Sequence, residues 1–144
     1  CGLKKTLGEL RAVHSSRHVF GTDAPRFKNQ DNDIDDRIGN AAAATQDAVH
    51  PLIIRHPISG AKALYVNPGF TIGIEGWADN ESKALLDMLY EHAKQPEHAF
   101  RFQWNPGSIA FWDNRATWHY AVNDYHGARR LMHRITLDGE VLAA

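Results

Sequence analysis

The stretch that decides the fold reads Trp112-Asp113-Asn114-Arg115-Ala116-Thr117-Trp118-His119-Tyr120-Ala121-Val122 and, after a short polar turn, Arg129-Arg130-Leu131-Met132-His133-Arg134-Ile135-Thr136-Leu137. Two strand-like runs joined by a tight polar turn are typical of a β-hairpin. Because strand side chains alternate between faces, Arg130 and Arg134 share one face of the second run. The hairpin predicts that His119, on the first run, lies near Arg130.

Short β-rich runs recur along the chain upstream of this hairpin. They lie at residues 52–55, 63–66, 70–74, 100–104 and 108–112, with turns between them. The pattern predicts a mainly β chain with helical insertions (α+β), arranged as an antiparallel sandwich or a jelly roll.

Two helices are expected among these strands. Residues 80–94 carry an apolar face, with Asp79 or Asn80 as a cap and Pro96 as the stop. Residues 3–16 carry a narrow apolar stripe at helical spacing, which predicts a second helix. Between them, the polar stretch 21–48 is expected to be either a lid or a disordered segment.

Bulk composition narrows the class of protein. The 144 residues suffice for one domain, and 43% hydrophobic with 23% charged residues is ordinary for a globular protein. A formal net charge of -1 gives no field that attracts nucleic acid or a membrane surface. The single cysteine, Cys1, allows no internal disulfide, and with no signal-peptide pattern we expect a cytoplasmic location.

The hairpin also carries the candidate chemistry. Two arginines on one strand face are costly to bury unless each meets an anion, and a guanidinium grips a carboxylate or sulfonate with parallel hydrogen bonds. Taken by composition alone, however, Arg130 and Arg134 would more often pair with acidic residues of the fold, and His119 would more often be a packed histidine.

The order of motifs adds to this reading. His56-Pro57-Ile58-Ser59-Gly60, Ala63-Leu64-Tyr65-Val66-Asn67, Gly69-Phe70-Thr71, Trp104 with Pro106-Gly107, Phe111 to Arg115 and the two hairpin runs occur in the order found in one family. In that order the chain resembles the Fe(II)- and 2-oxoglutarate-dependent dioxygenases of the taurine dioxygenase family. The resemblance covers nearly the whole chain apart from residues 21–48, and it implies a partial double-stranded β-helix (jelly roll).

The resemblance also implies roles for individual residues. His119 matches the distal histidine of the iron site, and Arg130 matches the arginine that binds the distal carboxylate of 2-oxoglutarate. Arg134 matches the arginine that faces the substrate sulfonate, and Phe70 matches an aromatic residue of the substrate pocket. Asp113 and Asn114 match a corner to which we assign no chemistry. The implied cofactors are Fe(II) and 2-oxoglutarate, and the implied partner is a small anionic, taurine-like substrate.

The chain departs from the family at the iron site. The family's other two ligands lie in a His-x-Asp/Glu motif, and none of the nine histidines is followed by Asp or Glu two positions later. We therefore expect residues 1–144 to be the C-terminal portion of a single catalytic domain, inactive alone. The open sheet edges of such a portion suggest a homo-oligomer.

Two other functions stay open. A non-catalytic half-domain would bind small anions through Arg130 and Arg134 without redox chemistry. A histidine metal protein would use His14 and His18, which are spaced for joint metal binding if they lie on a helix, but no third ligand is evident nearby.

Overall fold

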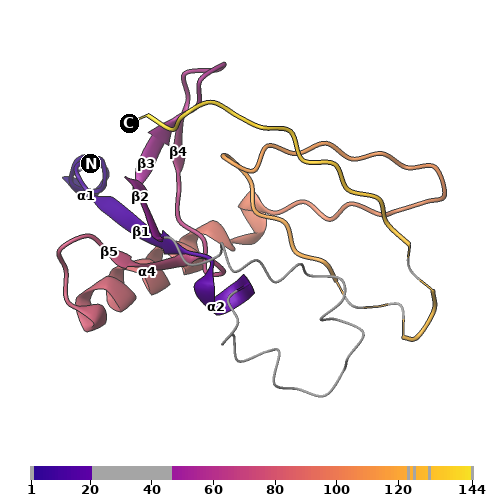
Figure 1. Ribbon diagram of the computed structural model, residues 1–144, viewed down its shortest axis with the longest axis horizontal. Helices are drawn as coiled ribbons and strands as arrows, with labels where there is room; N and C mark the ends of the chain where they lie inside the picture. The colour runs from indigo at the N-terminus through magenta and orange to yellow at the C-terminus, as the bar shows by residue number, and fades with distance from the viewer. Residues whose placement is uncertain (1, 21–46, 123, 125, 130, 144) are drawn as a thin grey trace.

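The computed structural model describes residues 2–20, 47–122, 124, 126–129 and 131–143. Its helices and strands all lie before residue 99 (Figure 1), with these bounds: α1 Gly2–Leu7, β1 Arg11–Ser15, α2 Arg17–Phe20, β2 Asp47–Pro51, β3 Ile53–Arg55, β4 Lys62–Leu64, β5 Thr71–Ile74, α4 Asp79–Ala93 and the 3₁₀ helix η2 Pro96–His98. No helix in these ranges is long and apolar enough to cross a membrane. The expected lid or disordered segment, 21–48, lies outside the described residues except for 47 and 48, which begin β2.

Two antiparallel sheets form the framework. The first has the strand order β2-β1-β5, and the second pairs β3 with β4. Val13 at the centre of β1 stands opposite Val49 on one side and Gly73 on the other. The register shifts between Val13 and His14 on the β5 side, which is a local irregularity of the ladder.

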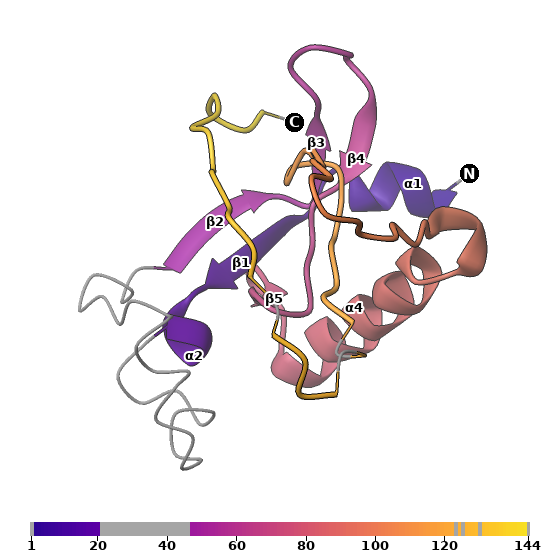
Figure 2. The same cartoon turned by 90° about the vertical axis from the view of Figure 1, so that its right-hand side faces the viewer.

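The core lies where the first sheet meets α4. Its buried side chains come from α1, from β1 and β5, from the connections between strands and from α4: Leu7, Ala12, Leu52, Val66, Ile74, Leu86 and Leu89. α4 runs alongside β5 in both views (Figure 1, Figure 2). One helix thus covers one sheet, and Ile54 in β3 is fully buried as well.

α4 confirms the helix expected at 80–94. Leu86 and Leu89 are buried at the spacing of one helix face, and Leu85 is half-buried beside them. The cap differs from the expectation, because Ala78 is the N-cap and Asp79 is already helical. The Glu81 carboxylate accepts the Ala78 main-chain N–H at 3.2 Å, which satisfies one of the donors at the helix start.

The single helix expected at 3–16 is wrong. α1 ends at Leu7, where the Gly8 N–H bonds back to the carbonyl oxygens of Lys4 and Lys5, and the chain then enters β1. β1 is the central strand and pairs with a neighbour on both sides, so sheet pairing outweighs the helical spacing of the leucines. His14 lies on β1 and His18 on α2, and the helical metal pair is therefore wrong as well.

Strands were also expected at 100–104, 108–112, 116–122 and 129–137, and this expectation is wrong for the described residues of these segments. They run extended beyond the two sheets (Figure 1) without a ladder of main-chain hydrogen bonds. A strand needs a paired neighbour, and alternating residues supply only the side chains for it. An isolated antiparallel bridge, with the Arg55 N–H donating to the Ala143 carbonyl at 2.9 Å, returns the chain to β3.

The fold class is therefore corrected in part. Antiparallel sheets with helices give a mixed α and β fold, as expected, but the helices together hold more of the described residues than the strands do. The described strands close no barrel.

Candidate functional site

His119 lies in an extended, exposed part of the chain. Its ring meets the indole of Trp112, with ring centroids 5.0 Å apart and planes inclined by 42°. The Trp112 indole N–H donates to the side-chain oxygen of Asn114 at 3.0 Å. The chain reverses direction between these aromatic rings, and residues 112–119 are called the corner below.

Asp113 organises the corner through its carbonyl and its carboxylate. The carbonyl oxygen accepts the Ala116 N–H at 3.1 Å, the Thr117 N–H at 3.0 Å and the Thr117 hydroxyl at 2.7 Å. The carboxylate accepts the Arg115 main-chain N–H at 2.8 Å and two guanidinium N–H groups of Arg115. An aspartate that bonds the backbone two residues ahead favours a turn over a strand.

His56 ties the corner to the second sheet. Its Nδ1 accepts the Ser59 N–H at 3.2 Å, so Nε2 carries the proton and donates to Asp113 at 2.8 Å. Hydrogen bonds from Arg115 first and His56 second hold the pKa of Asp113 well below its usual range. The carboxylate thus stays ionised, and its partners His56 and Arg115 are only 16% and 22% exposed.

Trp118 anchors the other end of the corner. Its indole N–H donates to the Val66 carbonyl at 2.9 Å, and its ring meets Tyr90 of α4 edge-on at 5.7 Å. The residue next to His119 is therefore held against the core, while His119 itself is exposed. Sequence reasoning missed the contacts of Trp118, His56 and Arg115, because the motifs at 56–60 and 111–115 were used only as parts of a family pattern.

The structure describes two of the three other expected site residues, Arg134 and Phe70. Arg134 is exposed and makes no ion pair within the part of the chain that the structure describes. Phe70 lies in the turn before β5, where its carbonyl accepts the Ser15 N–H at 2.8 Å, and its side chain is 38% exposed. Arg130 lies outside the described residues. The grouping of these residues with His119 in one pocket stays a prediction.

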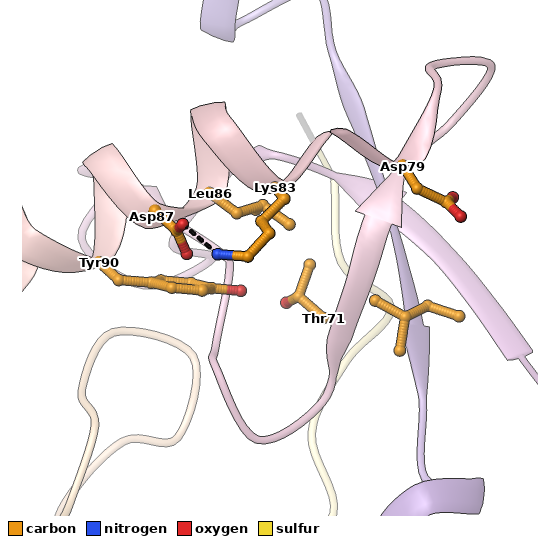
Figure 3. A pocket seen from close by; sticks show the side chains of 7 residues that line it. Thr71, Asp79, Lys83, Leu86, Asp87 and Tyr90 are labelled. Carbon is orange, nitrogen blue, oxygen red and sulfur yellow. Dashed lines mark hydrogen bonds and ion pairs between the residues drawn. The ribbon is translucent and has the colours of Figure 1, made fainter. Parts of the chain in front are cut away.

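A pocket of about 270 Å³ lies elsewhere, between β5 and α4. Figure 3 shows Tyr90, Asp87, Leu86 and Lys83 along the helix, with Thr71 facing them from the strand. Asp79 and Ile72 complete the lining, and Lys83 pairs with Asp87. Since it includes none of the expected site residues, this pocket is not the predicted site.

A histidine cluster lies on the first sheet. The rings of His14, His50 and Tyr65 approach one another with centroids 5.4–5.7 Å apart. Burial, and then the nearby His50, lower the pKa of His14 to about 4. His14 is therefore neutral at physiological pH and packs as part of the fold.

The iron implied by the resemblance needs a set of ligands that lie close together. The described residues contain no group of three His, Cys, Asp or Glu side chains close enough to hold a metal ion. His119 contacts an indole, and its neighbouring carboxylate, Asp113, is committed to Arg115 and His56. These residues alone do not fit a complete iron site.

Curated relatives match nearly the whole chain. The chain is 37% identical over 140 residues to an alkylsulfatase of Acinetobacter baylyi, covering 96% of this chain and 43% of that protein. It is 36% identical over 144 residues to an alpha-ketoglutarate-dependent sulfate ester dioxygenase of Pseudomonas putida, covering 96% of this chain and 45% of that protein. The chain thus spans less than half the length of these relatives.

Solved structures agree with these sequence matches. A taurine dioxygenase from Burkholderia xenovorans superposes with a TM-score of 0.59 at 35% identity, covering 81% of this chain and 32% of that one. The segments that carry the corner and its anchors fall inside the range matched to one family, residues 2–136. On this match, the chain belongs to the taurine catabolism dioxygenase TauD, TfdA family.

Proposed function

We propose that this chain is the C-terminal portion of an Fe(II)- and 2-oxoglutarate-dependent dioxygenase that hydroxylates a small anionic substrate, a sulfonate or a sulfate ester. The observation that carries the proposal is the family match over residues 2–136, which includes His119 and both arginines in their expected order. The names of two relatives, an alkylsulfatase and a sulfate ester dioxygenase, support a sulfur oxyanion as the substrate group.

The proposed site divides its work among four residues. His119 is the metal ligand, Arg130 binds the distal carboxylate of 2-oxoglutarate, and Arg134 binds the substrate anion. Phe70 lines the substrate pocket. The exposed position of Arg134, without an ion pair among the described residues, supports its role because a guanidinium already locked to a carboxylate would not bind a second anion.

The rest of the iron site is proposed to come from protein outside these residues. Two observations support this: the chain spans less than half of its relatives' length, and its described residues lack a three-ligand group. Bound iron and 2-oxoglutarate would supply the oxidation, while this portion supplies one imidazole and the anion-binding groups. The isolated chain is expected to be inactive, and the jelly roll is expected to be complete only in the longer protein.

A chimaera tests the function directly. The upstream part of the Pseudomonas putida relative would be joined to this chain, and succinate formation would be measured with Fe(II), 2-oxoglutarate and an alkyl sulfate. We expect turnover by the chimaera and none by residues 1–144 alone or by the chimaera with His119→Ala. Tight Fe(II) binding to the isolated chain in an anaerobic titration would contradict the divided site.

The alternative is a non-catalytic half-domain that binds small anions through Arg130 and Arg134. The lack of a three-ligand group among the described residues favours it over a self-contained enzyme. It predicts that residues 1–144 bind sulfate or 2-oxoglutarate without metal, and that the chimaera gives no succinate. A homo-oligomer and a cytoplasmic location remain part of the proposal for the chain.

A further inference from the structure

The orientation of His119 cannot come from a sheet in this structure. Residues 99–122 have no strand, so no ladder of main-chain hydrogen bonds fixes the direction of its side chain. What surrounds His119 instead is the corner, whose hydrogen bonds converge on Asp113. The orientation of the His119 side chain must therefore come from side-chain contacts of residues 112–119.

The corner has two anchors on the ordered framework. Trp118 reaches the Val66 carbonyl at 2.9 Å and the ring of Tyr90. At the other end, Asp113 reaches the His56 ring at 2.8 Å. His56 directly follows β3, and its N–H donates to the Ala61 carbonyl at 2.8 Å. The β3–β4 hairpin therefore holds His56 in place. The corner is thus suspended between the first sheet's core and the second sheet.

His119 lies directly after the Trp118 anchor. Trp118 is half-buried against the core, whereas the His119 side chain is exposed. The His119 ring meets Trp112, whose position follows from Asp113 next to it and from the bond to Asn114. Movement of Asp113 would shift the Trp112 ring and thereby change its contact with His119.

We propose that Asp113, gripped by His56 and Arg115, is the positioning residue that fixes the orientation of the His119 imidazole. The inference rests on the proposed function only in naming His119 as a metal ligand. The relation itself is a property of the metal-free chain. The proposal gives a function to the hydrogen bond between His56 and Asp113. This bond ties the corner, and with it the His119 ring, to the β3–β4 hairpin.

Nuclear magnetic resonance of the metal-free chain, labelled with ¹⁵N at histidine, tests the proposal. Cross-relaxation between the His119 and Trp112 ring protons reports their contact. The imidazole ¹⁵N chemical shifts report which ring nitrogens of His119 carry a proton. Asp113→Ala and His56→Leu should abolish the contact while the backbone spectrum of β1, β5 and α4 stays unchanged. His56→Gln should restore it, because the glutamine amide can still donate to Asp113.

A matched control removes an ion pair that does not involve the corner. Glu75→Gln breaks the 3.0 Å pair with Arg11 on the first sheet and should leave the His119 contact intact. Persistence of the contact in Asp113→Ala and His56→Leu would overturn the proposal. So would a His56→Gln variant as defective as His56→Leu, or a Glu75→Gln variant that loses the contact too.

The same variants separate this inference from the proposed function. In the chimaera, Asp113→Ala should weaken Fe(II) binding, with His56→Gln close to the parent protein. If the chimaera binds no Fe(II) but the metal-free contact still depends on Asp113 and His56, the function fails and the positioning role stands. If the chimaera turns over equally well with Asp113→Ala and keeps its Fe(II) affinity, the positioning role fails and the function stands.

Discussion

His14 is a histidine whose protonation the fold opposes. Its Nδ1 shares a hydrogen bond with the Thr71 hydroxyl at 3.2 Å, while its Nε2 is enclosed without a hydrogen-bond partner among the described residues. The rings of His50 and Tyr65 surround it, and neither offers an anion to stabilise an imidazolium. The sequence placed His14 on a helix face, and only the pairing of β1 with two neighbours explains its enclosure.

A pH dependence of stability follows from the lowered pKa of His14. The unfolded chain binds this proton near pH 6.5 and the folded chain only near 4, so the free energy of unfolding should fall as pH drops from 6.5 towards 4. After allowance for partial contact with water, the loss is on the order of 1–2 kcal/mol. Urea unfolding at pH 7.5 and pH 5 should show it, with a smaller loss in His14→Gln. An equal loss in His18→Gln and His14→Gln would contradict this assignment.

Arg130 and Arg134 allow a second test at the scale of single residues, in a chimaera that turns over substrate. Arg130→Ala should raise the 2-oxoglutarate concentration needed for half-maximal rate, and Arg134→Ala should mainly raise that of the anionic substrate. Loss of a charge-assisted pair predicts changes of roughly ten- to a hundredfold. Arg129→Ala, in the same run, is the matched control. Variants that alter only the melting temperature would identify both arginines as structural.

At the scale of elements, a helix or strand could be predicted only where its own residues determine its secondary structure. α4 was predictable because its apolar spacing, its acidic first turn and Pro96 all agree. Residues 3–16 were not, because Gly8 interrupts the leucine stripe and β1 gains two neighbouring strands. The corner was expected only as a feature shared with a family, since the hydrogen bond between Asp113 and His56 joins parts that are far apart in sequence.

Ser82 joins α4 to β5 and gives an element-scale prediction. Its hydroxyl accepts the Ile74 N–H at 3.0 Å, and the residue is only 3% exposed. Ser82→Ala should leave that N–H buried without a partner and lower the free energy of unfolding by about 1–3 kcal/mol. Ser59→Ala removes an acceptor of the same kind in an exposed turn and should cost far less. Equal losses in chemical denaturation would show that the buried bond has no special weight.

At the scale of the whole molecule, the ordered framework and the extended C-terminal segments differ in how they bury apolar side chains. Phe111 is 93% exposed, Ile135 88% and Leu137 85%. Alternating residues made strands a reasonable expectation there, but a strand forms only against a partner, and the sequence of one strand does not contain its neighbour. Exposed apolar surface on this scale is typical of an interface.

Self-association of the chain is the corresponding prediction. Sedimentation velocity of residues 1–144 should show association that rises with concentration, and Ile135→Thr with Leu137→Thr should reduce it. Ile58→Thr is the control, because Ile58 is 87% exposed but lies in the β3–β4 turn. A chain that remains monomeric at all concentrations would remove the support for a homo-oligomer.

The bridge between Arg55 and Ala143 has a practical consequence for handling the protein. Because Ala143 pairs with Arg55 at the border of β3, a change that displaces Ala143 should loosen the β3–β4 hairpin. Purification handles or fluorescent labels are accordingly safer on the α1 side than after Ala143. Isotope-exchange rates at the Arg55 amide would register any disturbance that such an appendage causes.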